Sequence, residues 1–134
     1  MTTAPDLGPH LEAVVGALEG AGLAVGQGGA PSPMPASKRY VALYMDPGTV
    51  GRESLADRRT DLALLFQVTC VGPTAEQCLW VAQQVRRALF GPLMVAGRAT
   101  WRPEELGGPP VARDDDVSPP LFFLPVQYRL QSTA

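Results

Sequence analysis

The stretch TDLALLFQVTCVGPTAEQCLWVAQQVRRALFGP, residues 60–92, carries the two clearest secondary-structure signals of the chain. In its first twelve residues apolar side chains recur at every second position: Leu62, Leu64, Phe66, Val68 and Cys70. A period of two predicts a strand with one buried face. The intervening positions are mixed in character: Asp61, Ala63, Leu65, Gln67 and Thr69. Such a mixture suits a second face that a neighbouring subunit covers in part.

The second half of the same stretch predicts a helix. Thr74 stands three residues before Gln77, which is the spacing of a capping box. Apolar residues then recur at helical spacing: Ala75, Leu79, Ala82, Val85 and Leu89. Gly91 and Pro92 end the pattern, as expected at a helix C-terminus. A strand, a short turn and a helix in succession indicate a helix packed back across a sheet.

A further helix is predicted near the N-terminus, where apolar residues form a single helical stripe: Leu7, Leu11, Val14, Val15 and Leu18. Asp6 is a candidate N-cap, with Pro9 in the first turn. Gly20 and Gly22 would end this helix. Residues 26–37, rich in glycine and proline, are predicted to form a flexible surface loop.

The remaining strands are less regular. Residues 38–45 alternate and contain β-branched and aromatic side chains, which predicts a strand. Residues 46–59 form a long polar loop, of a kind that is usually functional or mobile. Residues 93–103 resemble two short strands around a turn, whereas residues 104–120 look irregular. The last apolar stretch, residues 121–132, predicts a strand that is at an edge or bulged at Pro125, because proline cannot donate to a ladder.

The predicted order is therefore α-β-β-α-β-β-β within one domain, residues 1–134. The fold class is α+β, with a single mixed or antiparallel sheet of about four to five strands packed against two helices. The chain has 134 residues, which is a common size for one domain with one core.

Composition excludes several classes of function. With a net charge of -2, the chain has no broad basic surface for nucleic acid, so no specific nucleic-acid binding is expected. No apolar run approaches a membrane span, and no membrane partner is predicted. Cys70 and Cys78 do not form a disulfide framework and are interpreted as small core residues in a reducing, intracellular compartment.

No catalytic motif is found. The single histidine, His10, lies in the first turn of a helix and is interpreted as a surface or capping residue. It is far in sequence from any candidate nucleophile, so neither an enzyme nor a cofactor is predicted. Asp114, Asp115 and Asp116 leave three readings open: a divalent-cation site, a solvated turn, or an electrostatic contact with arginines of another subunit.

The order of segments resembles the tail terminator, or tail completion, proteins of long-tailed bacteriophages of actinobacterial hosts. The resemblance covers residues 38–132. It is carried by RRTD before the long strand, by the junction VTCVGPTAEQ, and by the ending DDDVSPPLF to QYRL. Small α+β subunits of this family close into a ring, usually hexameric, on the end of the tail tube.

The resemblance implies a structural role in the virion, at the junction of tail and neck, after assembly in the host cytoplasm. The implied partners are further copies of the chain in a head-to-tail ring, the tail tube protein and a head-completion or connector protein, and DNA would pass through the ring. The rival hypotheses are another neck component such as a stopper or adaptor, a small cation-binding accessory enzyme, and a monomeric ligand-binding domain.

We expect the loops 46–59 and 112–119 to make the contacts between subunits or with the tube. A heterologous ring interface pairs different patches of one subunit, so opposite charges at two places are consistent with it. The candidate interface residues are Arg52, Arg58, Arg59, Asp61, Asp114, Asp115 and Asp116.

Overall fold

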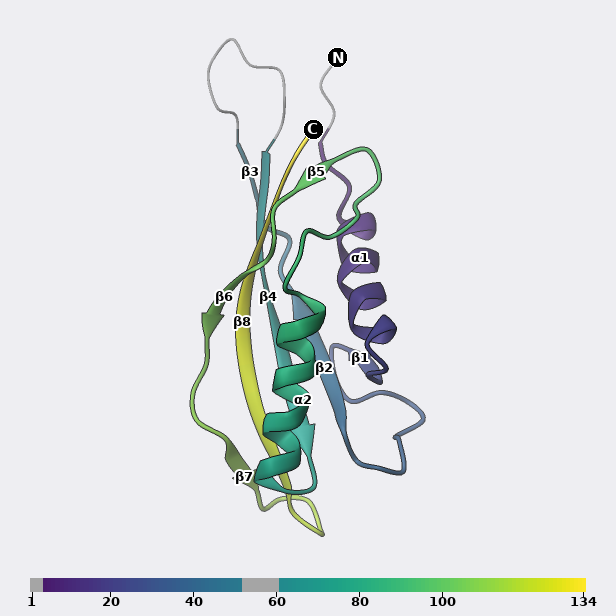
Figure 1. Ribbon diagram of the computed structural model, residues 1–134, viewed down its shortest axis with the longest axis vertical. Coiled ribbons are helices and arrows are strands. Elements are labelled where there is room, and N and C mark those ends of the chain that lie inside the picture. The colour runs from purple at the N-terminus through teal and green to yellow at the C-terminus, as the bar shows by residue number, and fades with distance from the viewer. Residues whose placement is uncertain (1–3, 52–60) are drawn as a thin grey trace.

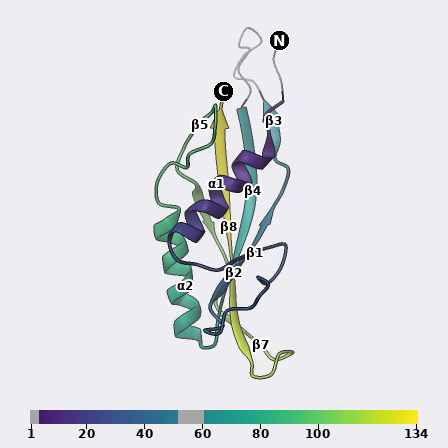
Figure 2. The same ribbon diagram turned by 90° about the vertical axis from the view of Figure 1, so that its right-hand side faces the viewer.

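The computed structural model describes residues 4–51 and 61–134. Within these residues, two helices lie on the same face of an eight-stranded sheet, and the other face carries no helix (Figures 1 and 2). The elements are α1 (Leu7–Gly20), β1 (Val25–Gln27), β2 (Tyr40–Met45), β3 (Thr49–Gly51), β4 (Asp61–Gly72), α2 (Ala75–Ala88), β5 (Ala99–Thr100), β6 (Glu104–Gly107), β7 (Ala112–Asp114) and β8 (Leu121–Thr133). The α+β class predicted from the sequence is confirmed.

The two long strands β4 and β8 form the centre of the sheet. They pair antiparallel along their whole length, from Asp61 opposite Thr133 to Gly72 opposite Phe122. β2 and β3 pair with the other side of β4, and β5, β6 and β7 pair with the other side of β8. Among the described strands, only β1 is parallel to its neighbour, β2. The sheet is therefore mixed, with eight strands rather than the predicted four to five.

The core lies between this sheet and the two helices. The predicted buried face of β4 is confirmed, because all five of its alternating apolar residues are buried: Leu62, Leu64, Phe66, Val68 and Cys70. Phe66 stacks on its cross-strand partner Tyr128, with 5.3 Å between the ring centroids. Aromatic pairs of this kind stabilise a sheet beyond the burial of their area. The β4–β8 pair thus anchors the fold.

The predicted helices are present, but the buried face of α2 differs from the prediction. The Thr74 hydroxyl accepts from the backbone N–H of Gln77 at 3.1 Å, so the predicted cap is correct. The predicted stripe is correct at Val85 and Leu89, which are buried, but wrong at Leu79, which is 54% exposed. In the first half of the helix the buried residues are instead Cys78 and Val81. Gly72 explains the rotation: a Cβ there would lie 2.6 Å from the backbone nitrogen of Cys78, so this side of α2 abuts the sheet.

α1 begins after Asp6, which has an extended backbone but makes no side-chain capping bond. The helix ends at Gly20, and Gly22 adopts a positive φ of 84° just beyond it. This is the left-handed conformation that glycine supplies at helix ends. The predicted bounds of α1 are therefore close to those observed.

Four short strands fall in segments predicted to be loops: β1, β3, β6 and β7. Each has only three or four residues, too few to show a periodicity of their own. They are ordered by backbone pairing with β2, β4 or β8, which is a long-range effect. Of the two short strands predicted in residues 93–103, the structure has β5 and one isolated bridge between Val95 and Arg98.

Pro125 is not at an edge of the β4–β8 pair, because its register with Thr69 is continuous. The interruption predicted from proline is found on the other side of β8. There β6 ends opposite Gln127 and β7 begins opposite Phe123, which leaves Pro125 between the two. A Cβ on Gly108 would lie 1.9 Å from the Pro125 carbonyl oxygen, so the chain passes this gap closely only because residue 108 is glycine.

Candidate interaction surface

The three predicted aspartates lie at the end of β7 and in the turn that follows it. Asp114 Oδ1 accepts from the backbone N–H of Asp116 at 3.0 Å, and Asp115 Oδ1 lies 2.6 Å from Arg113 Nε. Within the residues that the structure describes, no group of three or more histidine, cysteine or acidic side chains could hold a metal ion. The local contacts support the turn reading, while a contact between subunits stays a prediction.

Asp61 lies at the other end of the sheet. It is the first residue of β4 and pairs with Thr133, whereas Asp114 pairs with Leu121 at the start of β8. One Asp61 carboxylate oxygen and the Thr133 hydroxyl are buried without a hydrogen-bond partner in the structure as described. The structure therefore does not bring Asp61 together with the three aspartates within one subunit. Arg52, Arg58 and Arg59 lie outside the described residues.

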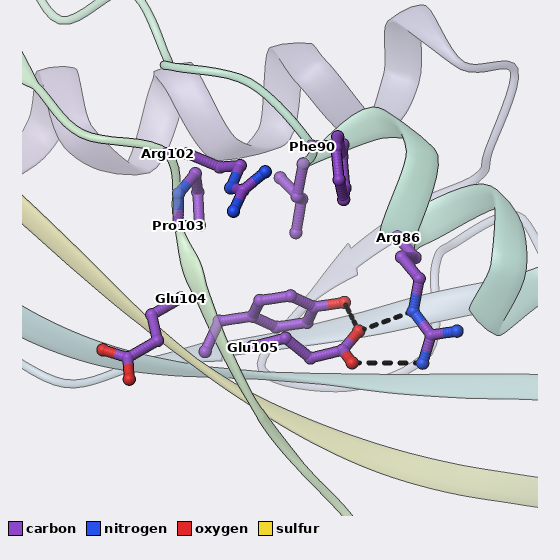
Figure 3. Close-up of a pocket in the computed structure, with 8 residues that line it drawn as sticks. Arg86, Phe90, Arg102, Pro103, Glu104 and Glu105 are labelled. Atoms are coloured by element: carbon purple, nitrogen blue, oxygen red, sulfur yellow. Dashed lines mark hydrogen bonds and ion pairs between the residues drawn. The ribbon is translucent and has the colours of Figure 1, made fainter.

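A groove that the sequence did not predict lies between the C-terminal part of α2 and β6 (Figure 3). Its volume is about 460 Å³. The residues that line it come from α2, β6, β8 and the segment between α2 and β6, residues 89–103, which we call the connector. They are Arg86, Leu89, Phe90, Arg102, Pro103, Glu104, Glu105 and Tyr128. Its walls thus combine two arginines and two glutamates with apolar and aromatic surface.

Both oxygens of the Glu105 carboxylate accept hydrogen bonds inside this groove. Oε1 accepts from Arg86 Nε at 3.0 Å and from the Tyr128 hydroxyl at 3.2 Å, and Oε2 accepts from Arg86 Nη2 at 3.1 Å (Figure 3). The bidentate Arg86 contact lowers the pKa of Glu105 below its usual value. Burial, followed by the adjacent Glu105, raises the pKa of Tyr128. This ion pair joins α2 to β6, and the positive charge of Arg86 balances the negative charge of Glu105.

Arg102 differs from the other charged residues of the groove. Its guanidinium lies over the Phe90 ring, 4.4 Å from the centroid, and forms no ion pair among the described residues. Phe90 is itself 65% exposed. Nearby on the same connector, Met94 and Trp101 are also exposed. Exposed aromatic residues and methionine beside arginine are typical of protein interfaces. No periodicity marks this irregular segment, so no sequence pattern predicted an interface there.

The helix-free face of the sheet is a second exposed surface. Tyr44 and Leu65 are each more than two-fifths exposed, and they line a shallow hollow with Gln67 and Gln127. The two glutamines are linked across β4 and β8 by a hydrogen bond of 2.6 Å. This is the mixed face that the sequence predicted for β4. Its covering by another subunit stays a prediction.

The structure corrects the interpretation of His10. Its side chain is fully buried, and it contacts Ser132 from the opposite end of the chain, with Nε2 2.7 Å from the hydroxyl. Nδ1 lies 2.7 Å from the Asp6 carbonyl, and a carbonyl only accepts, so Nδ1 carries the proton. In the tautomer with its proton on Nδ1, Nε2 accepts from the Ser132 hydroxyl, whose oxygen accepts from Arg98 Nε at 2.8 Å.

Histidine beside serine is the pairing that activates a nucleophile in some hydrolases. Here Ser132 is 1% exposed and His10 is 0% exposed, so a substrate cannot reach the hydroxyl in this structure. The serine oxygen is also engaged by Arg98. The arrangement is a buried hydrogen-bond chain that joins α1, the connector and β8.

The two cysteines are buried, as predicted, and neither forms a disulfide. The Cys78 thiol donates to the backbone carbonyl of Cys70 at 3.2 Å. Burial, with a smaller contribution from Cys78, raises the pKa of Cys70 to about 12, and burial raises that of Cys78 to about 11. Both are therefore thiols at neutral pH.

Comparison with known proteins gives information on the fold. No protein-family model and no curated protein sequence matches the chain. One similar solved structure is a chain of the virion of a native gene transfer agent particle, with a TM-score of 0.64 and 19% identity over 91% of this chain and 92% of the other. Another solved chain, whose description names no function, has a TM-score of 0.59 and 19% identity over 96% of both chains. The chain thus shares its fold with these two proteins over more than nine-tenths of its length.

No helix in the described residues is long and apolar enough to cross a membrane.

Proposed function

We propose that this chain is a structural virion protein, and more specifically a tail terminator that forms a ring on the end of a phage tail tube. The observation that carries the proposal is the fold shared over nine-tenths of both chains with a component of a virion particle. The resemblance of residues 38–132 to tail terminators supports the finer assignment.

The surfaces of the subunit are consistent with a ring. A closed head-to-tail ring needs two different patches on each subunit. The chain offers an aspartate-rich turn after β7 and, elsewhere, a groove beside α2 in which Arg102 forms no ion pair within the described residues. The helix-free face of the sheet provides further exposed apolar area around Leu65. Such a ring would cover the end of the tube, stop addition of tube protein and present a surface to a head-completion or connector protein.

The proposal is tested by polymerising the tube protein with and without this chain and measuring tube lengths by electron microscopy. A terminator added at substoichiometric amounts should shorten the tubes and be seen as a ring at one end. Unchanged lengths with no bound ring would refute the terminator assignment. If the chain instead bound isolated connector complexes and left the tubes bare, it would be a stopper or an adaptor.

A further inference from the structure

The turn after β7 presents an anion and an apolar side chain together. Asp116 and Val117 are adjacent in the chain, and both are exposed. Asp115 is paired with Arg113, but the Asp116 carboxylate forms no ion pair among the described residues. We call Asp116 and Val117 the acidic tip.

The acidic tip is held in place before any partner arrives. β7 leads into the turn and β8 leads out of it, and the two strands pair from Ala112 opposite Phe123 to Asp114 opposite Leu121. Asp114 also accepts from the backbone N–H of Asp116, which closes the turn. A preorganised segment loses less conformational entropy on binding than a free loop does. The tip is therefore suited to insertion into a groove.

The α2–β6 groove has the complementary chemistry. Glu105 forms an ion pair with Arg86, and Glu104 forms one with Arg129, whose Nε donates to it at 3.0 Å. Arg102 is then the remaining charge of the groove, and it lies on the exposed Phe90 ring. The groove can thus accept one carboxylate at Arg102 and an apolar side chain against the ring.

We propose that the acidic tip of one copy docks in the α2–β6 groove of a second copy, with the Asp116 carboxylate on Arg102 and Val117 against Phe90. The tip lies at the β7 end of the molecule, and the groove lies along its side between α2 and β6 (Figures 1 and 3). The contact is therefore heterologous and can propagate from copy to copy. It deepens the proposed function, because it assigns the residues that join neighbours in the proposed ring.

Charge exchange tests this contact. Arg102→Glu and Asp116→Arg should each weaken self-association about tenfold, because each places like charges together at the contact. The double variant should restore it, since the ion pair is then present with its partners exchanged. Self-association is measured by sedimentation equilibrium up to millimolar concentration at low salt. Arg87→Glu and Glu19→Arg are matched controls, because both residues are exposed and outside the groove.

Restoration by the double variant, with both controls unchanged, would support the contact. Single variants that associate like the wild type would overturn it, and so would a wild-type chain that stays monomeric throughout. Loss in Arg102→Glu without rescue would show that the groove takes a different segment, which also overturns the proposal. The tube-length assay separates the two hypotheses: a chain that shortens tubes equally well with either single variant keeps the terminator function and loses this contact.

Discussion

Replacement of Ser132 by alanine tests the buried hydrogen-bond chain between the two ends of the polypeptide. The Ser132 oxygen is the shared atom of two contacts, one to His10 at 2.7 Å and one from Arg98 at 2.8 Å. Alanine leaves the His10 Nε2 lone pair buried without a donor. An unsatisfied buried polar group costs about 1–3 kcal/mol, so we expect Ser132→Ala to lower the free energy of unfolding by about 2 kcal/mol.

The expected loss is large enough to measure by heat or denaturant. The entropy of unfolding is about 2.1 cal/mol/K per residue, so 2 kcal/mol corresponds to a fall in Tm of about 7 °C for a chain of this length. Urea denaturation followed by circular dichroism should show a lower midpoint with an unchanged slope. Ser118→Ala is the matched control, since Ser118 is exposed and should change stability by less than about 0.5 kcal/mol.

A double-mutant cycle separates the contact from general effects of either substitution. His10→Leu leaves the Ser132 hydroxyl proton without an acceptor, although its oxygen still accepts from Arg98. The double variant His10→Leu/Ser132→Ala removes both polar groups of the His10–Ser132 contact. The double variant should therefore be more stable than the sum of the single losses implies, by about 1 kcal/mol or more. Additive losses, or a Ser132→Ala variant as stable as the control, would refute the hydrogen-bond chain.

Two further predictions follow from the pKa shifts. With pKa values of about 12 and about 11, Cys70 and Cys78 should not react with a thiol reagent at pH 8 in the native chain, and both should react once it is unfolded; rapid native labelling would contradict their burial. Because the pKa of Glu105 is lowered in the folded state, its stabilising contribution is present above its unfolded pKa and is lost as the pH falls through its folded pKa. Glu105→Gln should therefore be less stable than the wild type by about 0.5 kcal/mol at pH 7, a value reduced by solvent exposure. The difference should begin to shrink near the unfolded pKa of about 4.3 and should disappear once the pH is below the folded pKa. An equal difference at pH 7 and below the folded pKa would exclude the ion pair as its cause.

The sequence predicted correctly those elements that are marked by a repeated apolar pattern or by a local capping motif. The alternation in β4 identified its buried face, and the Thr74 cap located the start of α2. The first half of the α2 face was predicted wrongly because Leu79 and Val81 are both apolar, and the choice between them depends on the close approach of Cys78 to Gly72. That approach is a tertiary property with no period of its own.

The candidate site was harder to predict for the same reason. Asp114 to Asp116 stand out in the sequence, and the structure places them in one exposed turn. Glu105 gives no such signal, because its partners Arg86 and Tyr128 are 19 and 23 residues away. His10 and Ser132 are 122 residues apart, and only the pairing of β4 with β8 and the packing of α1 bring them together.

The connector between α2 and β6 links the stability of the fold to the proposed contact. It has little regular secondary structure, but hydrogen bonds hold it at several points. The Thr100 hydroxyl donates to the Leu93 carbonyl, the backbone N–H of Trp101 donates to the Gln131 carbonyl at 3.2 Å, and Arg98 donates to Ser132. These contacts hold the segment on which Arg102 is carried. Ser132→Ala removes the Arg98 Nε contact but keeps the one from Arg98 Nη2 to the Ser132 carbonyl at 3.2 Å. It should therefore loosen one wall of the groove in part, while the acidic tip stays intact. If the proposed docking is correct, Ser132→Ala should weaken self-association even where the chain remains folded, and the docking would lose this structural support if association were unchanged.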